Sequence, residues 1–280
     1  MIDSPNGDEP APTQPVFLAL PARSSKPRDR GITHVLDKGL SLKTLESWLD
    51  LAGAHIDVVK FGWGTAYVSG DVARKVAACR AHDVRVSPGG TLFEIAVMQG
   101  KTREFARWVA EMGMDAVEVS EGTVGLAPEL KRQLIRDFAQ DFTVLSEVGS
   151  KDPMAPVVPA EWAERMREDL AAGASYVIAE GRETGTVGLY APSGEVREEL
   201  VEAIVREIPV ARVIFEAPTK RQQAWFVKHV GTEANLGNIP PDEVLGVETL
   251  RRGLRADTAW LSVRSWTPSL VAQAMFERSG

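Results

Sequence analysis

The feature that most constrains the fold of this chain is an alternation of strand-like and helix-like segments that occurs eight times. Short aliphatic and β-branched runs alternate with segments in which apolar residues recur at helical period, and no linker-like stretch interrupts them. This pattern predicts an α/β protein built as a single (β/α)8 TIM barrel. The expected strands are residues 33–37, 56–62, 84–87, 116–120, 143–148, 176–180, 212–216 and 234–239. The expected helices are residues 42–52, 70–81, 102–113, 127–140, 159–173, 195–207, 220–230 and 241–254.

A doubly wound open sheet is the competing architecture, but no GxGxxG motif follows the first expected strand. The barrel domain is expected to span residues 23–280, after an N-terminal extension of residues 1–22. Its first part, "MIDSPNGDEPAPTQP", is rich in proline and acidic residues, which predicts disorder. The C-terminal "SWTPSLVAQAMFERSG" is interpreted as an extra, apolar-faced helix. It would cover the barrel or a neighbouring subunit, which leaves a homo-oligomer open.

Composition excludes several classes of protein. A chain of 280 residues with 44% hydrophobic residues can bury a large core. The net charge of −7 argues against a nucleic-acid binder, which would need a basic face. No apolar run is long enough to span a bilayer. The single cysteine excludes an internal disulfide framework, so we expect a reducing, cytoplasmic location.

Acidic residues stand at the ends of several expected strands. They are Asp37, Glu118, Glu147, Glu180 and Glu216. Glutamate is depleted in strands and rarely buried without a partner, so this placement is unfavourable unless it has a use. Because the carboxyl ends of barrel strands carry the catalytic groups, the pattern predicts a functional carboxylate cluster rather than unrelated ion pairs in loops.

Such a cluster predicts a divalent cation. Oxygen ligands without histidine or cysteine at ligand spacing favour Mg²⁺ over zinc. Glu147 is the first expected metal ligand, Glu118 and Glu180 come next, and Asp37 is a fourth candidate. Glu216 is interpreted as a placed group whose role is equally to orient Lys60 or Lys220.

Cationic and glycine-rich elements near the same strand ends predict a phosphorylated substrate. "NLGNI" occupies the eighth strand position, where barrels often bind phosphate on backbone N–H groups. "GRETGTVGLY" adds a planar guanidinium suited to phosphate or carboxylate. "KPR" lies before the first strand, on the side that a barrel normally uses for stability. The expected anion-binding residues are Arg182, Lys220, Gly237, Asn238, Lys26 and Arg28.

Long motifs in a fixed order resemble those of the phosphosulfolactate synthase family. They are "KPRDRGITHVLDKGL", "KFGWGT", "PGGTLFE", "EVSEG", "SEVGSKDP", "EGRETGTVGLY", "FEAPTKRQQAWF", "NLGNI" and "LRRGLRADT". The resemblance runs from about Lys26 to Thr258. It implies a TIM barrel that uses Mg²⁺ to add sulfite to phosphoenolpyruvate, giving (R)-2-phospho-3-sulfolactate.

That chemistry requires an acid that protonates the substrate carbon C2 after sulfite has attacked the methylene carbon. Lys151 and Lys60 are the candidates. Lys151 follows Glu147 in a polar loop and is the preferred donor, whereas Lys60 stands within a strand, where a fixed cation is the more natural role.

Three alternatives stay open at the level of sequence. A related barrel enzyme would add another nucleophile to phosphoenolpyruvate. Lys60 would instead form a Schiff base in a metal-independent aldolase. The resembled family also includes plant heat-stress-associated proteins, which leaves a non-enzymatic, stress-related role.

Overall fold

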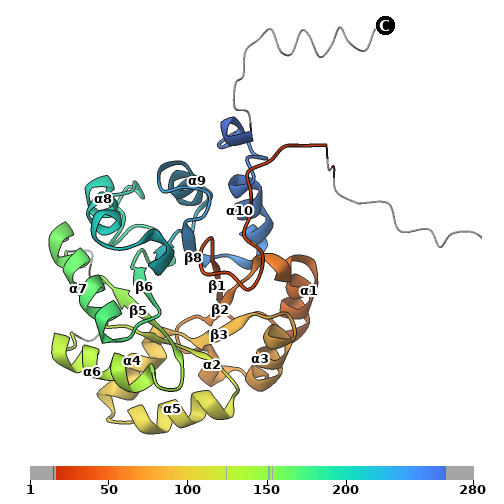
Figure 1. Ribbon diagram of the computed structural model, residues 1–280. Helices are drawn as coiled ribbons and strands as arrows, with labels where there is room; N and C mark the ends of the chain where they lie inside the picture. The colour runs from red at the N-terminus through yellow and green to blue at the C-terminus, as the bar shows by residue number, and fades with distance from the viewer. Residues whose placement is uncertain (1–14, 16, 124, 151, 153, 263–280) are drawn as a thin grey trace, which may run out of the picture.

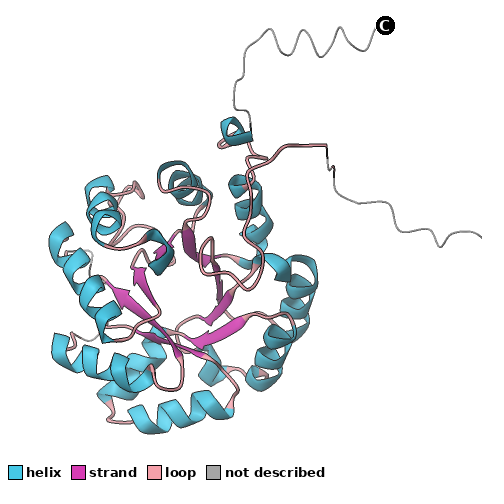
Figure 2. Cartoon of the chain, in the orientation of Figure 1, coloured by secondary structure: helices cyan, strands magenta, loops and turns pink. Residues whose placement is uncertain are grey.

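Eight parallel strands form a ring with helices packed around its outside, which confirms the predicted TIM barrel (Figures 1 and 2). The computed structural model describes residues 15, 17–123, 125–150, 152 and 154–262. Most of the expected N-terminal extension and the whole expected helix at residues 265–280 lie outside this part of the chain. The strands are β1 (Thr33–Asp37), β2 (Val58–Phe61), β3 (Arg85–Pro88), β4 (Ala116–Val119), β5 (Thr143–Val148), β6 (Tyr176–Ala179), β7 (Val213–Glu216) and β8 (Asn235–Ile239).

All eight helices expected within the barrel are present, and the described residues contain two further α-helices that were not expected. α7 begins with Pro159 at its first position and ends at Gly173, whose φ of 118° suits glycine. The missed helix α4 opens on Gly90 and is almost uniformly apolar, so it lacks the helical period that revealed the others. The second missed helix, α2, is a single turn. The helices are α1 (Leu42–Ala52), α2 (Thr65–Val68), α3 (Val72–Ala81), α4 (Gly90–Met98), α5 (Thr102–Glu111), α6 (Pro128–Phe138), α7 (Pro159–Ala172), α8 (Glu198–Glu207), α9 (Lys220–His229) and α10 (Val244–Arg251).

The inside of the barrel has an apolar layer below a charged one. Side chains alternate along a strand, so residues two positions apart project to the same side. The lower layer is the cluster of Ile32, Val58, Leu145, Ile178 and Ile214. Two positions further along, Lys60, Glu147 and Glu216 stand on β2, β5 and β7, and Glu180 stands directly after β6; all four are buried. The apolar layer therefore closes the barrel beneath a charged floor at the carboxyl ends of the strands.

The barrel has one seam without a backbone ladder. The hydrogen-bonded order is β3-β2-β1-β8-β7-β6-β5-β4, so β3 and β4 are the two edges, and they lie next to each other. Within the described residues, two carboxylates join them instead. The Asp115 carboxylate accepts the Val86 N–H at 2.9 Å, and the Glu118 carboxylate accepts the Gly90 N–H at 3.0 Å. We call this junction the β3–β4 seam.

The contact between Gly90 and Glu118 in the β3–β4 seam depends on glycine. A Cβ added at Gly90 would stand 2.7 Å from Glu118 Oε1, closer than such atoms approach. The "PGG" segment thus allows the backbone after β3 to reach the carboxylate on β4. Among the described residues, no helix has the length and apolar character needed to cross a membrane.

Candidate active site

A cavity of about 180 Å³ opens at the carboxyl ends of the strands. Its wall combines charged side chains from the strands with the loops that follow β2, β3, β4 and β6. Of the residues expected to form the site, it brings together Lys60, Glu118, Glu147, Glu180, Arg182, Glu216 and Asn238. The other described residues of the lining are Leu36, Trp63, Gly89, Gly90, Thr91, Thr123 and Glu183.

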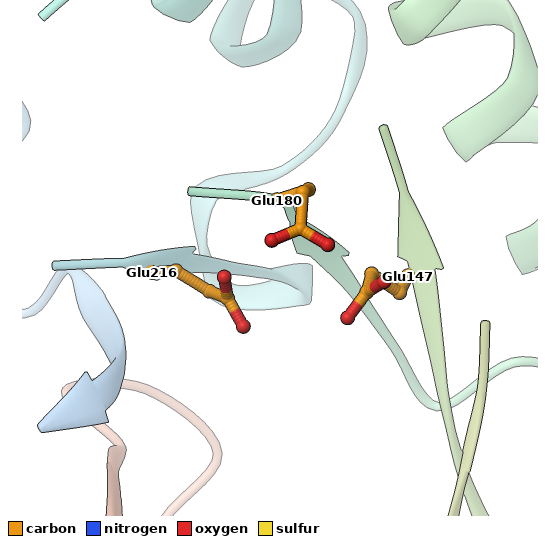
Figure 3. A group of neighbouring side chains, drawn as sticks. All are labelled: Glu147, Glu180 and Glu216. Atoms are coloured by element: carbon orange, nitrogen blue, oxygen red, sulfur yellow. The ribbon is translucent and has the colours of Figure 1, made fainter. Parts of the chain in front are cut away.

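Three carboxylates converge at this cavity. Glu147 lies on β5, Glu180 directly follows β6, and Glu216 ends β7 (Figure 3). Each offers one oxygen atom, these atoms lie within 4.8 Å of one another, and all three residues are buried. A divalent cation that prefers oxygen would match this donor set, because three carboxylates from one side leave coordination positions for water or substrate. The three residues therefore fit a Mg²⁺ ion.

Lys60 is a fixed cation between two of the carboxylates. Its Nζ lies 3.0 Å from Glu118 Oε2 and 3.2 Å from Glu216 Oε1, and the residue is buried. Burial acts to lower the pKa of Lys60, but the negative charges of Glu118, Glu216 and Glu147 outweigh it and raise the pKa well above its ordinary value. The ammonium therefore stays charged and neutralises part of the cluster.

The carboxyl group of Glu118 has a pKa raised towards neutral pH. Burial raises its pKa, the Lys60 ammonium lowers it, and the charges of Glu147 and Glu216 raise it further, to about 7. Its Oε1 also accepts the Gly90 N–H across the β3–β4 seam. Glu118 thus belongs both to the charged cavity and to the closure of the barrel.

Backbone contacts hold two of the three converging carboxylates, those of Glu216 and Glu180, in place. Glu216 Oε2 accepts the Gly181 N–H at 2.9 Å, and the buried Tyr190 hydroxyl donates to the backbone oxygen of Glu216. Glu180 Oε1 accepts the Arg182 N–H at 2.7 Å. Of the two cations that Glu216 was expected to orient, the structure pairs it with Lys60.

Three other expected residues lie outside the cavity. Asp37 is buried in an ion pair with Lys75 on α3 at 2.9 Å, and it accepts the N–H groups of Gly39 and Leu40. Lys220 begins α9 and pairs with Asp257 at 2.9 Å, with 48% of its side chain exposed. Gly237 pairs with Glu216 in the sheet but does not line the cavity. Asp37 therefore caps the turn after β1, which corrects its expected place beside the other carboxylates.

Lys26 and Arg28 lie at the opposite end of the barrel. Lys26 donates to the carbonyl oxygens of His82 and Asp83 at 3.0 and 3.2 Å, and Arg28 pairs with Asp57 at 3.1 Å. Asp57 and Asp83 precede β2 and β3, so this group is at the amino ends of the strands. The expectation that these two cations share the substrate site is corrected accordingly. Lys151 lies outside the described residues.

The sequence reasoning missed Trp63, Thr91, Thr123 and Glu183 in the cavity wall. The first two lie within "KFGWGT" and "PGGTLFE"; only Lys60 was chosen from the first motif, and no side chain was chosen from the second. Unusual glycine spacing was the available signal. A Cβ at Gly89 would lie 2.7 Å from both the N and the O atom of Trp63, so the two loops are tightly packed.

Comparison with known proteins agrees with this geometry. The family model described as (2R)-phospho-3-sulfolactate synthase (ComA) matches residues 21–257. Phosphosulfolactate synthase of Bacillus subtilis is 42% identical over 247 residues, covering 87% of this chain and 98% of that protein. Phosphosulfolactate synthase of Methanothermobacter thermautotrophicus is 43% identical over 244 residues, covering 85% and 95%. A crystal structure of 3-hexulose-6-phosphate synthase shares the fold, with a TM-score of 0.51 at 17% identity over 79% of this chain and 98% of that one. The chain thus belongs to the (2R)-phospho-3-sulfolactate synthase family.

Proposed function

We propose that this protein adds sulfite to phosphoenolpyruvate, giving (2R)-2-phospho-3-sulfolactate. The observation that carries the proposal is the 42% identity to a phosphosulfolactate synthase along 98% of that relative. In the reaction, the sulfur lone pair forms a bond to the methylene carbon, the carbon–carbon π bond breaks, and C2 takes up a proton. Both reactants are anions, so the protein must supply positive charge and a proton at defined places.

We propose Mg²⁺ as the cofactor, held by Glu147, Glu180 and Glu216. The supporting observation is their convergence, with one oxygen from each within 4.8 Å of the others. A cation there would stabilise the negative charge that develops on the substrate carboxylate. Glu118 was also expected among the ligands, but its contacts to Lys60 and Gly90 favour a supporting role.

The proposed roles of the other cavity residues follow from their contacts. Lys60 has a raised pKa and two carboxylate partners, so it supplies permanent positive charge beside the path of an anionic nucleophile. Arg182 and Asn238 line the same cavity, and the planar guanidinium suits the phosphate group. Among the described residues, Asn238 Oδ1 is buried without a hydrogen-bond partner, which favours a polar group of substrate or water beside it.

Lys151 remains the proposed proton donor. Lys60 is fixed by ion pairs to Glu118 and Glu216, which suits a stationary cation rather than a proton donor and favours the other candidate. Replacing Lys151 by Ala is expected to lower kcat by roughly 10²- to 10⁴-fold while leaving phosphoenolpyruvate binding largely intact. Normal turnover by this variant would contradict the assignment.

The test of the function is phosphorus NMR of phosphoenolpyruvate with protein, Mg²⁺ and sulfite. We expect the phosphoenolpyruvate signal to be replaced by that of a saturated phosphate ester, and only when sulfite is present. Omission of sulfite and the Glu147→Gln variant serve as controls. An unchanged spectrum with sulfite, or conversion with a different nucleophile alone, would refute the assignment of the substrate.

The raised pKa of Lys60 also opposes the Schiff-base aldolase, which needs a neutral amine. Failure of borohydride to trap a carbonyl substrate on the protein would agree with this. The proposed partners are the two small anions. A cytoplasmic location stays a prediction from the cysteine content.

A further inference from the structure

We propose that Trp63 is a substrate-contacting residue, whose indole packs against the flat, unsaturated carbon skeleton of the substrate and covers the cavity from water. This inference rests on the proposed function. Trp63 follows β2 and is the only aromatic side chain among the described residues that line the cavity. It is 43% exposed, so burial in the protein core does not account for its position.

The backbone of Trp63 carries the first argument. Its φ is 53°, a region that is costly for a bulky side chain and rare outside glycine. Among the described residues, four non-glycine residues have positive φ, and three of them, Trp63, Arg182 and Asn238, line this one cavity. Such strain persists where the surroundings enforce it, and it gathers at functional sites. Trp63 therefore shares an unfavourable backbone conformation with Arg182 and Asn238, two expected substrate-binding residues that line the same cavity.

Neighbouring strands hold this conformation. The N–H of Gly62 donates to the Asp37 carbonyl at 2.8 Å, and the N–H of Thr65 donates to the Gly62 carbonyl at 3.1 Å. On the other side, Gly89 approaches so closely that a Cβ there would stand 2.7 Å from Trp63 N and O. The loop after β2 is thus fixed from β1 and from the end of β3, which leaves the indole beside the cavity.

The chemistry of the cavity explains what an indole would do there. Apart from Trp63, Leu36 and two glycines, every described lining residue is charged or polar. Among them, Lys60, Arg182 and Asn238 can bind the phosphate and carboxylate of a small unsaturated acid, but none of the charged or polar groups offers a surface for its carbon–carbon double bond. An aromatic face packs well on a planar, unsaturated group. It would also keep water away from the reacting carbons, so that the proton comes from the positioned acid.

Two variants separate contact with substrate from structural support. Trp63→Gly removes the indole but accepts positive φ without strain. This relief offsets part of the lost packing and of the greater freedom of glycine in the unfolded chain, so the unfolding midpoint of this variant should fall only slightly. Its kcat/KM for phosphoenolpyruvate should fall about tenfold or more. Trp63→Phe keeps an aromatic face and should stay within about threefold of wild type. Tyr67→Ala is the matched control, because Tyr67 is an 81% exposed aromatic residue that does not line the cavity.

Fluorescence gives a readout that does not depend on turnover. Phosphoenolpyruvate should quench tryptophan emission of the wild type, and most of this quench should be lost in Trp63→Phe. Trp260→Phe should retain it, because Trp260 is 59% exposed and lies outside the cavity wall.

The outcomes that overturn the inference are distinct from failure of the proposed function. Wild-type activity in Trp63→Gly, or an undiminished quench in Trp63→Phe, would refute contact with the substrate. A fall in the unfolding midpoint of Trp63→Gly that accounts for its loss of activity would show a structural role instead. If the proposed function itself fails, the wild type will form no product and show no quench, and the inference fails with it.

Discussion

Replacing Glu118 by Gln is expected to remove a pH dependence from the stability of the metal-free protein. The amide keeps a carbonyl oxygen that can accept the Gly90 N–H, so the β3–β4 seam is preserved. What disappears is the titrating charge that faces Lys60 and the other carboxylates. The amide nitrogen then faces the Lys60 ammonium, which lowers stability at every pH, so the effect of the titrating charge is obtained from the change with pH.

The magnitude follows from the pKa. In the folded protein the pKa of Glu118 is about 7, above the ordinary value of 4.5. Between these values the folded state holds a proton that the unfolded chain releases, so wild-type stability falls as pH rises and the fall is complete above about pH 7. Each pKa unit is worth about 1.4 kcal/mol, which gives a loss of about 3 kcal/mol across the window. Glu118→Gln has no carboxyl group to titrate at this position, so its unfolding free energy does not fall in this way. Relative to the wild type, it should rise by about 3 kcal/mol as the pH increases from 4.5 to about 7.

The assay is urea unfolding in EDTA at about pH 5 and about pH 8, with the wild type, Glu118→Gln and a control at an exposed position. Glu104→Gln is suitable, because its side chain is 53% exposed in a surface pair with Lys101. The quantity to compare is the change in unfolding free energy between the two pH values. An equal change in the wild type and Glu118→Gln would refute the argument. It would also be refuted if the unfolding free energy of the variant, relative to the wild type, were higher at about pH 5 than at about pH 8.

Other consequences of the site can be measured separately. EDTA is expected to abolish turnover and added Mg²⁺ or Mn²⁺ to restore it, whereas full activity in chelator would contradict a metal held by the three carboxylates. Arg182→Lys keeps the charge but loses the planar fork, so steady-state kinetics should show a larger rise in KM for phosphoenolpyruvate than fall in kcat; a defect confined to kcat would assign Arg182 to the transition state. Gly89→Ala places a Cβ 2.6 Å from the Phe61 carbonyl oxygen and should lower the unfolding free energy by roughly 1–3 kcal/mol, while Gly70→Ala, with open space around it, should not; equal values for the two variants would refute the packing argument.

The sequence was sufficient to predict the barrel and the three converging carboxylates of the cavity, because both depend on short-range patterns. Strand parity alone places Glu147, Glu180 and Glu216 on the inner side at the same end of the barrel, once eight strands are assumed. Two of these strands, β1 and β5, have the expected bounds, since their aliphatic runs start and stop sharply. The long motifs then added the family, which no single residue would have indicated.

The remaining assignments depended on partners that are remote in sequence. Asp37 looks like the other strand-end acids until Lys75, 38 residues later on α3, is brought against it. Lys26 and Arg28 resemble phosphate ligands in composition, but their carbonyl and carboxylate partners at the amino ends of β2 and β3 become visible only in the folded barrel. Helix α4 was missed because an almost uniformly apolar segment has no period to detect.

The β3–β4 seam also determines where the chain can be cut. Starting at β4, the hydrogen-bonded order runs β4 to β8 and then β1 to β3. In a circularly permuted chain that begins before β4, the strands would therefore follow one another in the sequence in the same order as in the sheet. The N-terminal segment already lies against α10, since Arg23 pairs with Glu248 at 2.9 Å. New termini between α4 and α5, with a linker joining segments near the old ones, would therefore keep every ladder pair of the barrel. The hydrogen bonds from Val86 to Asp115 and from Gly90 to Glu118 would then link the first and last strands of the permuted chain, together with the bonds of Ser120 and Thr123 to Glu94 on α4.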